Sequence, residues 1–292
     1  MKFGIAFANT GPYASPGGAA TLAAAAEQAG FDSLWTVEHV IVPREYRSAY
    51  PYAPDGKMPG GGHFDIPDPL VWLTWVAAHT TTLRLATGIL ILPQRNPVVL
   101  AKEAATLDAL SGGRLVLGVG IGWLEEEFDV LGVPFADRAR RTDEYVAALR
   151  SLWSHDGDVA SFEGDVVSFR DVYCRPRPVD GAVPIVVGGH SPAAARRAGR
   201  IGDGFFPGRG DLPALLDEMR MAADGAGRDP DAIEVTWSGA TVMGGGDAAL
   251  EEVGRLADLG VSRLVVPPLS YDPAAVGDRL ARFGAEVIDQ AR

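Results

Sequence analysis

Short apolar runs alternate along the chain with longer stretches in which Ala and Leu recur at helical spacing. Runs of this length suit strands that are buried on both faces, and their alternation with helices is typical of a parallel sheet with crossover helices. The pattern predicts strands at residues 3–8, 33–37, 83–92, 115–119, 185–187, 204–207, 233–242 and 263–267. It predicts the partner helices near residues 18–29, 69–80, 98–110, 136–153, 192–199, 212–226, 248–259 and 273–291.

Eight such units can close into a (β/α)8 barrel, the TIM barrel, or form an open sheet with helices on both faces. The first predicted helix lacks the G-x-G-x-x-G opening of an open dinucleotide-binding sheet. The 292 residues also fall within the usual size of one barrel. We therefore predict an α/β protein in which residues 1–292 form a single barrel domain.

Two segments are longer than ordinary connections. Residues 41–68 form a polar loop rich in Pro and Gly after the second strand, which places it at the catalytic end of a barrel as a candidate lid. Residues 158–178 alternate like strands around a Gly-Asp turn, so they predict an inserted hairpin that covers part of the barrel.

Composition narrows the class of partner. Lys and Arg number 26 against 38 Asp and Glu, and the formal charge of −12 disfavours nucleic acid and anionic membranes. Cys174 is the only cysteine, which excludes an internal disulfide framework and multi-cysteine metal sites. We expect no signal peptide, no membrane-spanning segment and a cytoplasmic location.

Polar residues just after buried strands are the candidate site residues, because the loops that follow the strands build the active site of a barrel. Glu38 and His39 end the second predicted strand, where a histidine suits proton transfer, and a packing role explains it about equally well. Thr87, Gly88 and Ile89 interrupt the third strand and indicate a bulge, a bend or the close approach of another group.

Two glycine-rich segments are further candidates. Gly118, Gly120 and Gly122 end the fourth strand, and their missing side chains leave room for a flat ring or for neighbouring backbone. The fifth strand ends at Gly188 and Gly189 and is followed by His190, Ser191 and a proline that begin a helix. Free N–H groups and the helix dipole favour a phosphate there over an ordinary helix cap.

Other chemistries have little support in the sequence. The segment GGHSPAA lacks the G-x-S-x-G form of a nucleophile elbow, and the five histidines lack H-E-x-x-H spacing. We therefore predict neither a hydrolase nor a metal site. A set of aromatic residues suggests an apolar substrate cavity, although such residues belong to the core more often. The set is Tyr46, Tyr50, Tyr52, Phe64, Trp72, Trp75 and Trp123.

The chain resembles the luciferase-like monooxygenase family, especially the branch that uses the deazaflavin coenzyme F420. The resemblance is carried by residues 106–153 (TLDALSGGRLVLGVGIGWLEEEFDVLGVPFADRARRTDEYVAALRSLW), together with LWTVEHV, TGILILP and PIVVGG. It implies the same barrel with an insertion at 158–178, and a homodimer. It also suggests that Asp108, Arg114, Arg138 and Glu144 brace the fold.

The resemblance also implies roles for the candidate site residues. His39 would transfer a proton, and Glu38 would orient His39. Glu stands here where the family more often has Asp. Gly88–Ile89 would form a non-proline cis peptide behind the cofactor ring. Gly188 and Gly189 would hold the phosphate, with His190 and Ser191 as contributors. In sugar-phosphate dehydrogenases of the family an acid follows the strand-four glycines, but Trp123 holds that place here.

The function expected from the resemblance is hydride transfer between coenzyme F420 and a small or medium organic substrate. One alternative is a monooxygenase that uses reduced FMN and O₂, because both cofactors present a similar ring, ribityl chain and phosphate. The other is a flavin- or deazaflavin-binding protein without catalytic activity.

Overall fold

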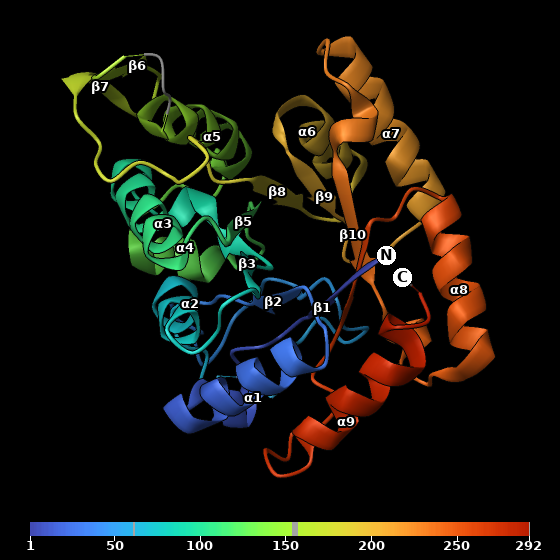
Figure 1. Ribbon diagram of the computed structural model, residues 1–292. Helices are drawn as coiled ribbons and strands as arrows, with labels where there is room; N and C mark the ends of the chain where they lie inside the picture. The colour runs from blue at the N-terminus through green and yellow to red at the C-terminus, as the bar shows by residue number, and fades with distance from the viewer. Residues whose placement is uncertain (61, 154–156, 292) are drawn as a thin grey trace.

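The computed structural model describes residues 1–60, 62–153 and 157–291, in which eight parallel strands close into a ring surrounded by helices (Figure 1). Each strand pairs with the next around the ring, and β3 pairs with β5 to close it. The predicted (β/α)8 barrel is therefore confirmed. The ring strands are β1 Lys2–Ile5, β2 Ser33–Thr36, β3 Arg84–Thr87, β5 Leu115–Gly120, β8 Ile185–Gly188, β9 Gly204–Phe206, β10 Glu234–Ser238 and β11 Arg263–Val266.

The helices begin where the sequence supplies caps. Ser15, Asp68, Asn96, Ser191 and Asp211 each accept a backbone N–H of the helix that follows, and each of these helices has a proline in its first two positions. The helices are α1 Pro16–Gln28, α2 Pro69–Ala77, α3 Pro97–Ser111, α4 Glu125–Leu131, α5 Arg138–Trp153, α6 Pro192–Ile201, α7 Leu212–Gly225, α8 Gly246–Asp258 and α9 Val276–Phe283.

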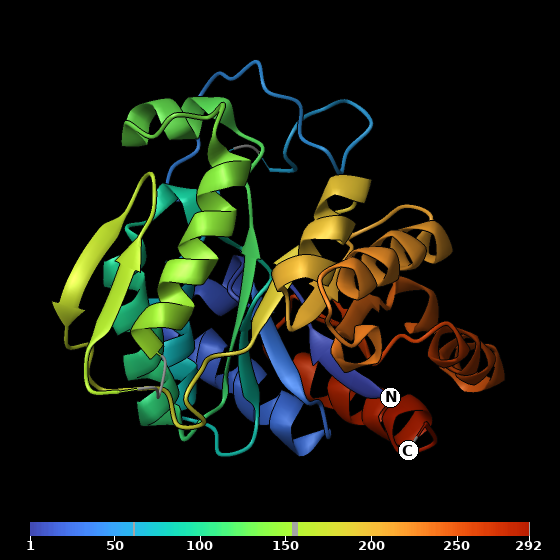
Figure 2. The same ribbon diagram turned by 90° about the horizontal axis from the view of Figure 1, so that it is seen from above.

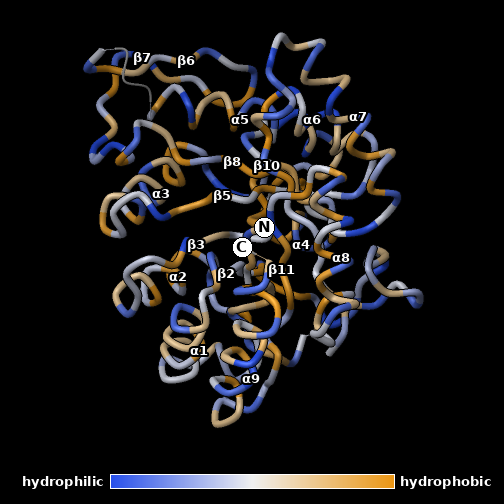
Figure 3. Tube along the Cα trace, turned by 45° about the vertical axis from the view of Figure 1, so that its right-hand side comes forward, coloured by the Kyte–Doolittle hydropathy of each residue, from blue (hydrophilic) through white to orange (hydrophobic). Residues whose placement is uncertain are grey.

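Apolar side chains form two separate cores. The larger core lies between the strands and the helices, and the apolar segments gather around the strands in the hydropathy view (Figure 3). The smaller core fills the inside of the ring and comprises Trp35, Ala86, Val116, Val186 and Val265. Because side chains fill the ring itself, a ligand site has to lie above it, at the ends of the strands.

Several strands and helices differ in their bounds from the predicted ones, and one helix was not predicted. The long third strand is divided into β3 and β4 (Leu90–Ile91) by a cis peptide bond between Gly88 and Ile89, the bond that the resemblance implied. The predicted strand 233–242 ends at Ser238 and turns into a short 3-10 helix. The last helix begins at Val276 and becomes a π-helix over Gly284–Ile288, and α4 was not predicted.

The inserted segment forms the predicted hairpin, with β6 (Ala160–Glu163) antiparallel to β7 (Ser168–Val172). Glu144 accepts the N–H groups of Val166 and Val167 at its turn, each at 2.8 Å. Asp108 accepts the N–H groups of Leu115 and Val179, and Arg114 donates to Ala77, Thr80 and Leu83. These contacts agree with the bracing roles expected for Asp108, Arg114 and Glu144.

No helix in the described part of the chain is long and apolar enough to span a membrane.

Candidate active site

His39 lies just beyond the end of β2, and its partner comes from α4, the helix that follows β5. Nδ1 of its ring is 3.1 Å from Oε2 of Glu127, the third residue of α4. The other carboxylate oxygen accepts the N–H groups of Val40 at 2.6 Å and Ile41 at 3.2 Å. Glu127 is fully buried. One carboxylate therefore fixes both the histidine ring and the first residues of loop 41–68.

Glu38 does not orient His39, so that part of the sequence-based prediction was wrong. Its buried carboxylate accepts hydrogen bonds from the guanidinium of Arg95 and from the N–H of Ile91, and Arg95 also contacts Asp68. Burial raises the pKa of the Glu38 carboxyl, while Arg95 and the N–H of Ile91 oppose the rise. Successive residues leaving β2 turn to different neighbours, which sends Glu38 toward Arg95 and His39 toward α4.

Arg95 and Asn9 hold the two ends of loop 41–68 together. Arg95 bridges Glu38, at the start of the loop, to Asp68, which caps α2 at its end. The fully buried Asn9 donates to the carbonyls of Val37 and Pro67 and accepts the N–H of Val37. Neither residue could be predicted from the sequence, because a bridge between positions so far apart leaves no local pattern.

The side chain of Ile89 fills the space that the strand-end glycines leave. A Cβ at Gly120 would lie 2.6 Å from Cδ1 of Ile89, and a Cβ at Gly188 would overlap Cγ2 of the same residue. A Cβ at Gly118 would overlap the carbonyl oxygen of Thr87, while Gly122 has φ of +79° and faces Phe128. These glycines are therefore closely approached by protein groups: backbone at Gly118, and side chains at Gly120, Gly122 and Gly188. Ile89 covers both Gly120 and Gly188.

The segment after β8 has the features of an anion site. Gly189 adopts φ of +129°, and Ser191 caps α6 by accepting the N–H of Ala194. Nδ1 of His190 is buried and has no hydrogen-bond partner in the described part of the chain. Burial, together with the nearby guanidinium of Arg209, lowers the pKa of His190. The ring therefore has an unused hydrogen-bonding nitrogen next to a helix N-terminus.

Loop 41–68 crosses the mouth of the barrel from β2 to β8. Figure 2 shows it passing over the strand ends between α4 and α6. Three tyrosines of the loop join aromatic residues on the two sides of the mouth. The ring of Trp123 has its centroid 5.7 Å from that of His39, 5.7 Å from that of Tyr46 and 5.3 Å from that of Tyr50. The series continues from Tyr50 to Tyr52 at 5.5 Å and from Tyr52 to His190 at 5.2 Å. The predicted pocket residues Tyr46, Tyr50 and Trp123 are thus brought together beside His39.

Three other members of the predicted aromatic set lie outside this series. Trp72 and Trp75 of α2 donate to the carbonyls of Tyr13 and Pro16, beside α1, so they pack on the outer layer. Phe64 packs within loop 41–68, close to Gly60.

Loop 41–68 is also fastened by Glu126. Its carboxylate accepts the N–H groups of Arg47 and Ser48 and the hydroxyl of Ser48. Burial favours the neutral form of Glu126, but these hydrogen bonds outweigh it and lower the pKa to about 2. Glu126 and Glu127 therefore anchor two successive parts of the loop to α4.

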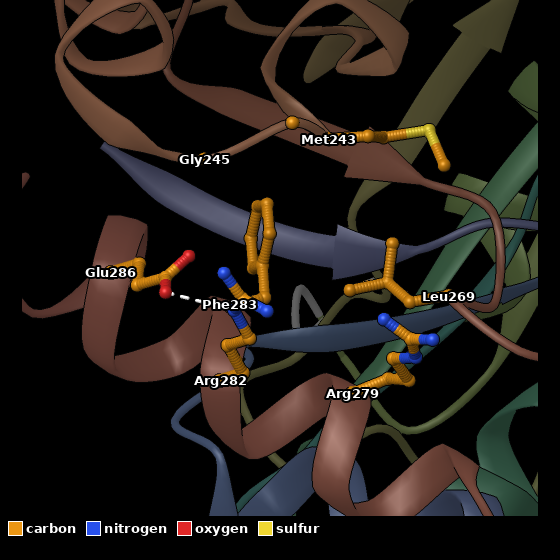
Figure 4. Close-up of a pocket in the computed structure, with 8 residues that line it drawn as sticks. Met243, Gly245, Leu269, Arg279, Arg282, Phe283 and Glu286 are labelled. Atoms are coloured by element: carbon orange, nitrogen blue, oxygen red, sulfur yellow. Dashed lines mark hydrogen bonds and ion pairs between the residues drawn. The ribbon is translucent and has the colours of Figure 1, made fainter.

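A separate cavity of about 250 Å³ lies between the connection from β10 to α8 and the C-terminal helical segment of residues 279–286 (Figure 4). Arg282 and Glu286, which line it, pair with each other at 2.8 Å. The cavity contains none of the predicted site residues. Its lining residues are Met243, Gly244, Gly245, Leu269, Arg279, Arg282, Phe283 and Glu286.

Solved structures share this architecture. The coenzyme F420 dependent tetrahydromethanopterin reductase from Methanopyrus kandleri aligns over 100% of this chain and 99% of its own, with a TM-score of 0.76 and 20% identity. The monooxygenase RslO1 from Streptomyces bottropensis aligns over 100% of both chains, with a TM-score of 0.77 and 24% identity. At these identities the likeness shows the fold alone.

Sequence comparison is more specific. An uncharacterized protein of Mycobacterium tuberculosis is 37% identical over 250 residues, which cover 84% of this chain and 83% of that protein. An F420-dependent glucose-6-phosphate dehydrogenase of Kineococcus radiotolerans is 36% identical over 231 residues, covering 76% of this chain and 63% of the dehydrogenase. The sequence model of the luciferase-like monooxygenases matches residues 1–283. The chain therefore belongs to the luciferase-like monooxygenase family.

Proposed function

We propose that this protein is an F420-dependent oxidoreductase that transfers a hydride between coenzyme F420 and a small or medium organic substrate. The observation that carries the proposal is the arrangement at the mouth, where His39 is fixed by a buried carboxylate beside Trp123 and Tyr50. The similarity to an F420-dependent dehydrogenase supports the choice of cofactor. Family membership and relatives of this kind make an oxidoreductase the best-supported class of enzyme.

The residues after β8 fit the phosphate end of such a cofactor. His190 has a buried nitrogen without a partner, α6 begins directly after it, and Arg209 lies on the neighbouring connection. An anion placed there would meet hydrogen-bond donors and positive charge, although the chain as a whole is acidic. Gly188, Gly189, His190 and Ser191 would therefore hold the phosphate.

The residues at the ends of the barrel strands, around Ile89, fit the flat ring system of the cofactor. Ile89, which lies against Gly120 and Gly188, would lie behind the cofactor ring, with Thr87 and Gly88 directly before it in the chain. When bound, F420 supplies a hydride donor or acceptor at C5 of its deazaflavin. His39 would exchange the proton that accompanies hydride transfer, and loop 41–68 would exclude water from the mouth.

Trp123 helps to define the type of substrate that the mouth accepts. It takes the position that an acidic residue holds in the sugar-phosphate dehydrogenases of the family, and its ring contacts His39, Tyr46 and Tyr50. We therefore propose that the protein does not use a carboxylate at this position and that its substrate lies against an aromatic wall.

Side-by-side fluorescence titrations with F420 and with FMN test the proposal. Low-micromolar binding of F420 with much weaker binding of FMN is the expected result. The reverse preference would favour a flavin monooxygenase, and binding of neither would remove the cofactor assignment. Binding of F420 without turnover of any substrate in a broad screen of alcohols, aldehydes and enones would favour a carrier protein.

A further inference from the structure

The contact between Glu127 and His39 bears on which nitrogen of the imidazole carries a hydrogen. An ionised carboxylate only accepts hydrogen bonds, so the ring nitrogen that faces Glu127 has to be the donor. In a neutral imidazole one nitrogen carries the hydrogen and the other is a base, and the bond made by one nitrogen sets the state of the other. Nδ1 of His39 faces Glu127 at 3.1 Å, which leaves Nε2 as the base.

The surroundings leave Nε2 available. In the described part of the chain it has no hydrogen-bond partner, and it is not among the polar atoms that are both buried and unpaired. The side chain of His39 is 10% exposed, while that of Glu127 is 0% exposed. The ring therefore has one nitrogen engaged inside the protein and one open to the mouth.

We propose that Glu127 is a positioning residue, which holds neutral His39 as the Nδ1–H tautomer so that Nε2 accepts the proton released by the substrate. This inference rests on the proposed function for the identity of the reaction, but the tautomer itself does not. The role that the sequence suggested for Glu38 is thus assigned to a residue in α4, because Glu38 is engaged by Arg95.

The substitution Glu127→Gln tests this role with almost no change of shape. The amide oxygen of Gln would still accept the N–H groups of Val40 and Ile41, as the carboxylate does now. Its NH₂ group would face Nδ1 of His39 and donate to it, which selects the opposite tautomer. Glu126→Gln is the matched control, because Glu126 holds Arg47 and Ser48 but does not contact His39.

Ring ¹⁵N NMR of histidine-labelled protein without cofactor gives the first measurement, with His39→Gln identifying the signals. In the spectrum of the neutral ring, we expect the hydrogen on Nδ1 in the wild type and in Glu126→Gln. We expect it on Nε2 in Glu127→Gln. A wild-type ring with its hydrogen on Nε2 would overturn the proposal without reference to any variant.

Kinetics give the second measurement. We expect Glu127→Gln to lower kcat on the order of 10²–10⁴-fold, the range for loss of correctly placed proton transfer, and to leave the Kd for F420 nearly unchanged. Glu126→Gln should keep most of kcat. Equal losses in the two variants would show that Glu127 acts only by holding the loop and would reject the positioning role.

Failure of the proposed function has a different signature. A protein that binds no F420 refutes the cofactor, whereas the ¹⁵N spectrum still decides the tautomer of His39. A protein that binds and reduces F420 but has the wrong tautomer refutes the role of Glu127 alone.

Discussion

Tyr52 lies against His190, with their ring centroids 5.2 Å apart, at the opposite side of the barrel mouth from the point where loop 41–68 leaves β2. The same tyrosine packs on Gly208, where a Cβ would lie 2.9 Å from Cε1 of its ring. Arg209 lies 5.7 Å above the ring. The loop thus spans the mouth. Its contact with the side of the mouth near β8 requires that residue 208 has no side chain.

Gly208→Ala should therefore loosen the loop. Displacing Tyr52 costs about 1–2 kcal/mol if the ring has to leave its place, which corresponds to a roughly 5–30-fold larger open population. Limited trypsin digestion at Arg47 and Lys57 reports this population, since cleavage follows local opening. We expect proportionally faster cleavage in the variant.

The control for this experiment is Gly254→Ala in α8, where a new Cβ meets no neighbour within 4 Å. Its cleavage rate at the loop should equal that of the wild type. Equal rates for Gly208→Ala and the wild type would show that Tyr52 adjusts without opening the loop.

Arg95→Met should destabilise the protein by about 3–5 kcal/mol, because it leaves the buried carboxyl of Glu38 without its charged partner. Burial already raises the pKa of Glu38. In the variant the folded state would keep a proton that the unfolded state releases, so stability falls as pH rises above the ordinary carboxyl range. The difference in Tm from the wild type should therefore widen as pH rises above the ordinary carboxyl range.

The double variant Arg95→Met, Glu38→Gln provides the comparison. Removing the charge should restore part of the lost stability and flatten its pH dependence. If the double variant is as unstable as the single variant at every pH, the loss comes from Asp68 or from packing instead.

The architecture was predictable because each strand and helix carries its own signal. Runs buried on both faces, together with caps such as Ser191 followed by proline, fix the order of the elements, and that order allows few folds. Gly88 marked the break in the third strand for the same reason, since a glycine inside a buried strand is a local anomaly.

The contacts within the site were less predictable, because they join segments that meet only when the barrel closes. Glu127 stands in a run of three acidic residues, and acids in the first turn of a helix are explained by the helix dipole alone. Glu38 adjoins His39 in sequence, which made it the natural partner, yet Arg95 engages it. The glycines at the strand ends indicated missing side chains, but nothing in the sequence indicated that the side chain of Ile89 lies against Gly120 and Gly188.

Gly120→Ala should disturb the surface that Ile89 forms. The added Cβ would lie 2.6 Å from Cδ1 of Ile89, so the side chain has to move, at a cost of about 1–3 kcal/mol. We expect lower stability in urea unfolding and weaker binding of F420. In the double variant Gly120→Ala, Ile89→Ala the overlap disappears, so the two effects should differ from additivity by at least about 0.5 kcal/mol. Additive effects would show that the two side chains do not compete for the same space.

Glu27→Gln should reduce stability at neutral pH but not in strong acid. The carboxylate of Glu27, at the end of α1, accepts the N–H groups of Thr81, Thr82 and Leu83 in the turn before β3.

Burial disfavours the charge on Glu27, yet these hydrogen bonds and that of the Thr82 hydroxyl lower the pKa from 4.5 to about 2. A depressed pKa gives stability that is complete above 4.5 and is lost as pH falls toward 2. The variant should therefore melt roughly 2–5 °C below the wild type at neutral pH, and the difference should close in acid. Glu251→Gln, on the exposed face of α8, should melt like the wild type throughout. If the Tm of Glu27→Gln stays below that of the wild type by the same amount down to pH 2, the charge of Glu27 does not contribute, and the loss comes from changed packing between α1 and this turn.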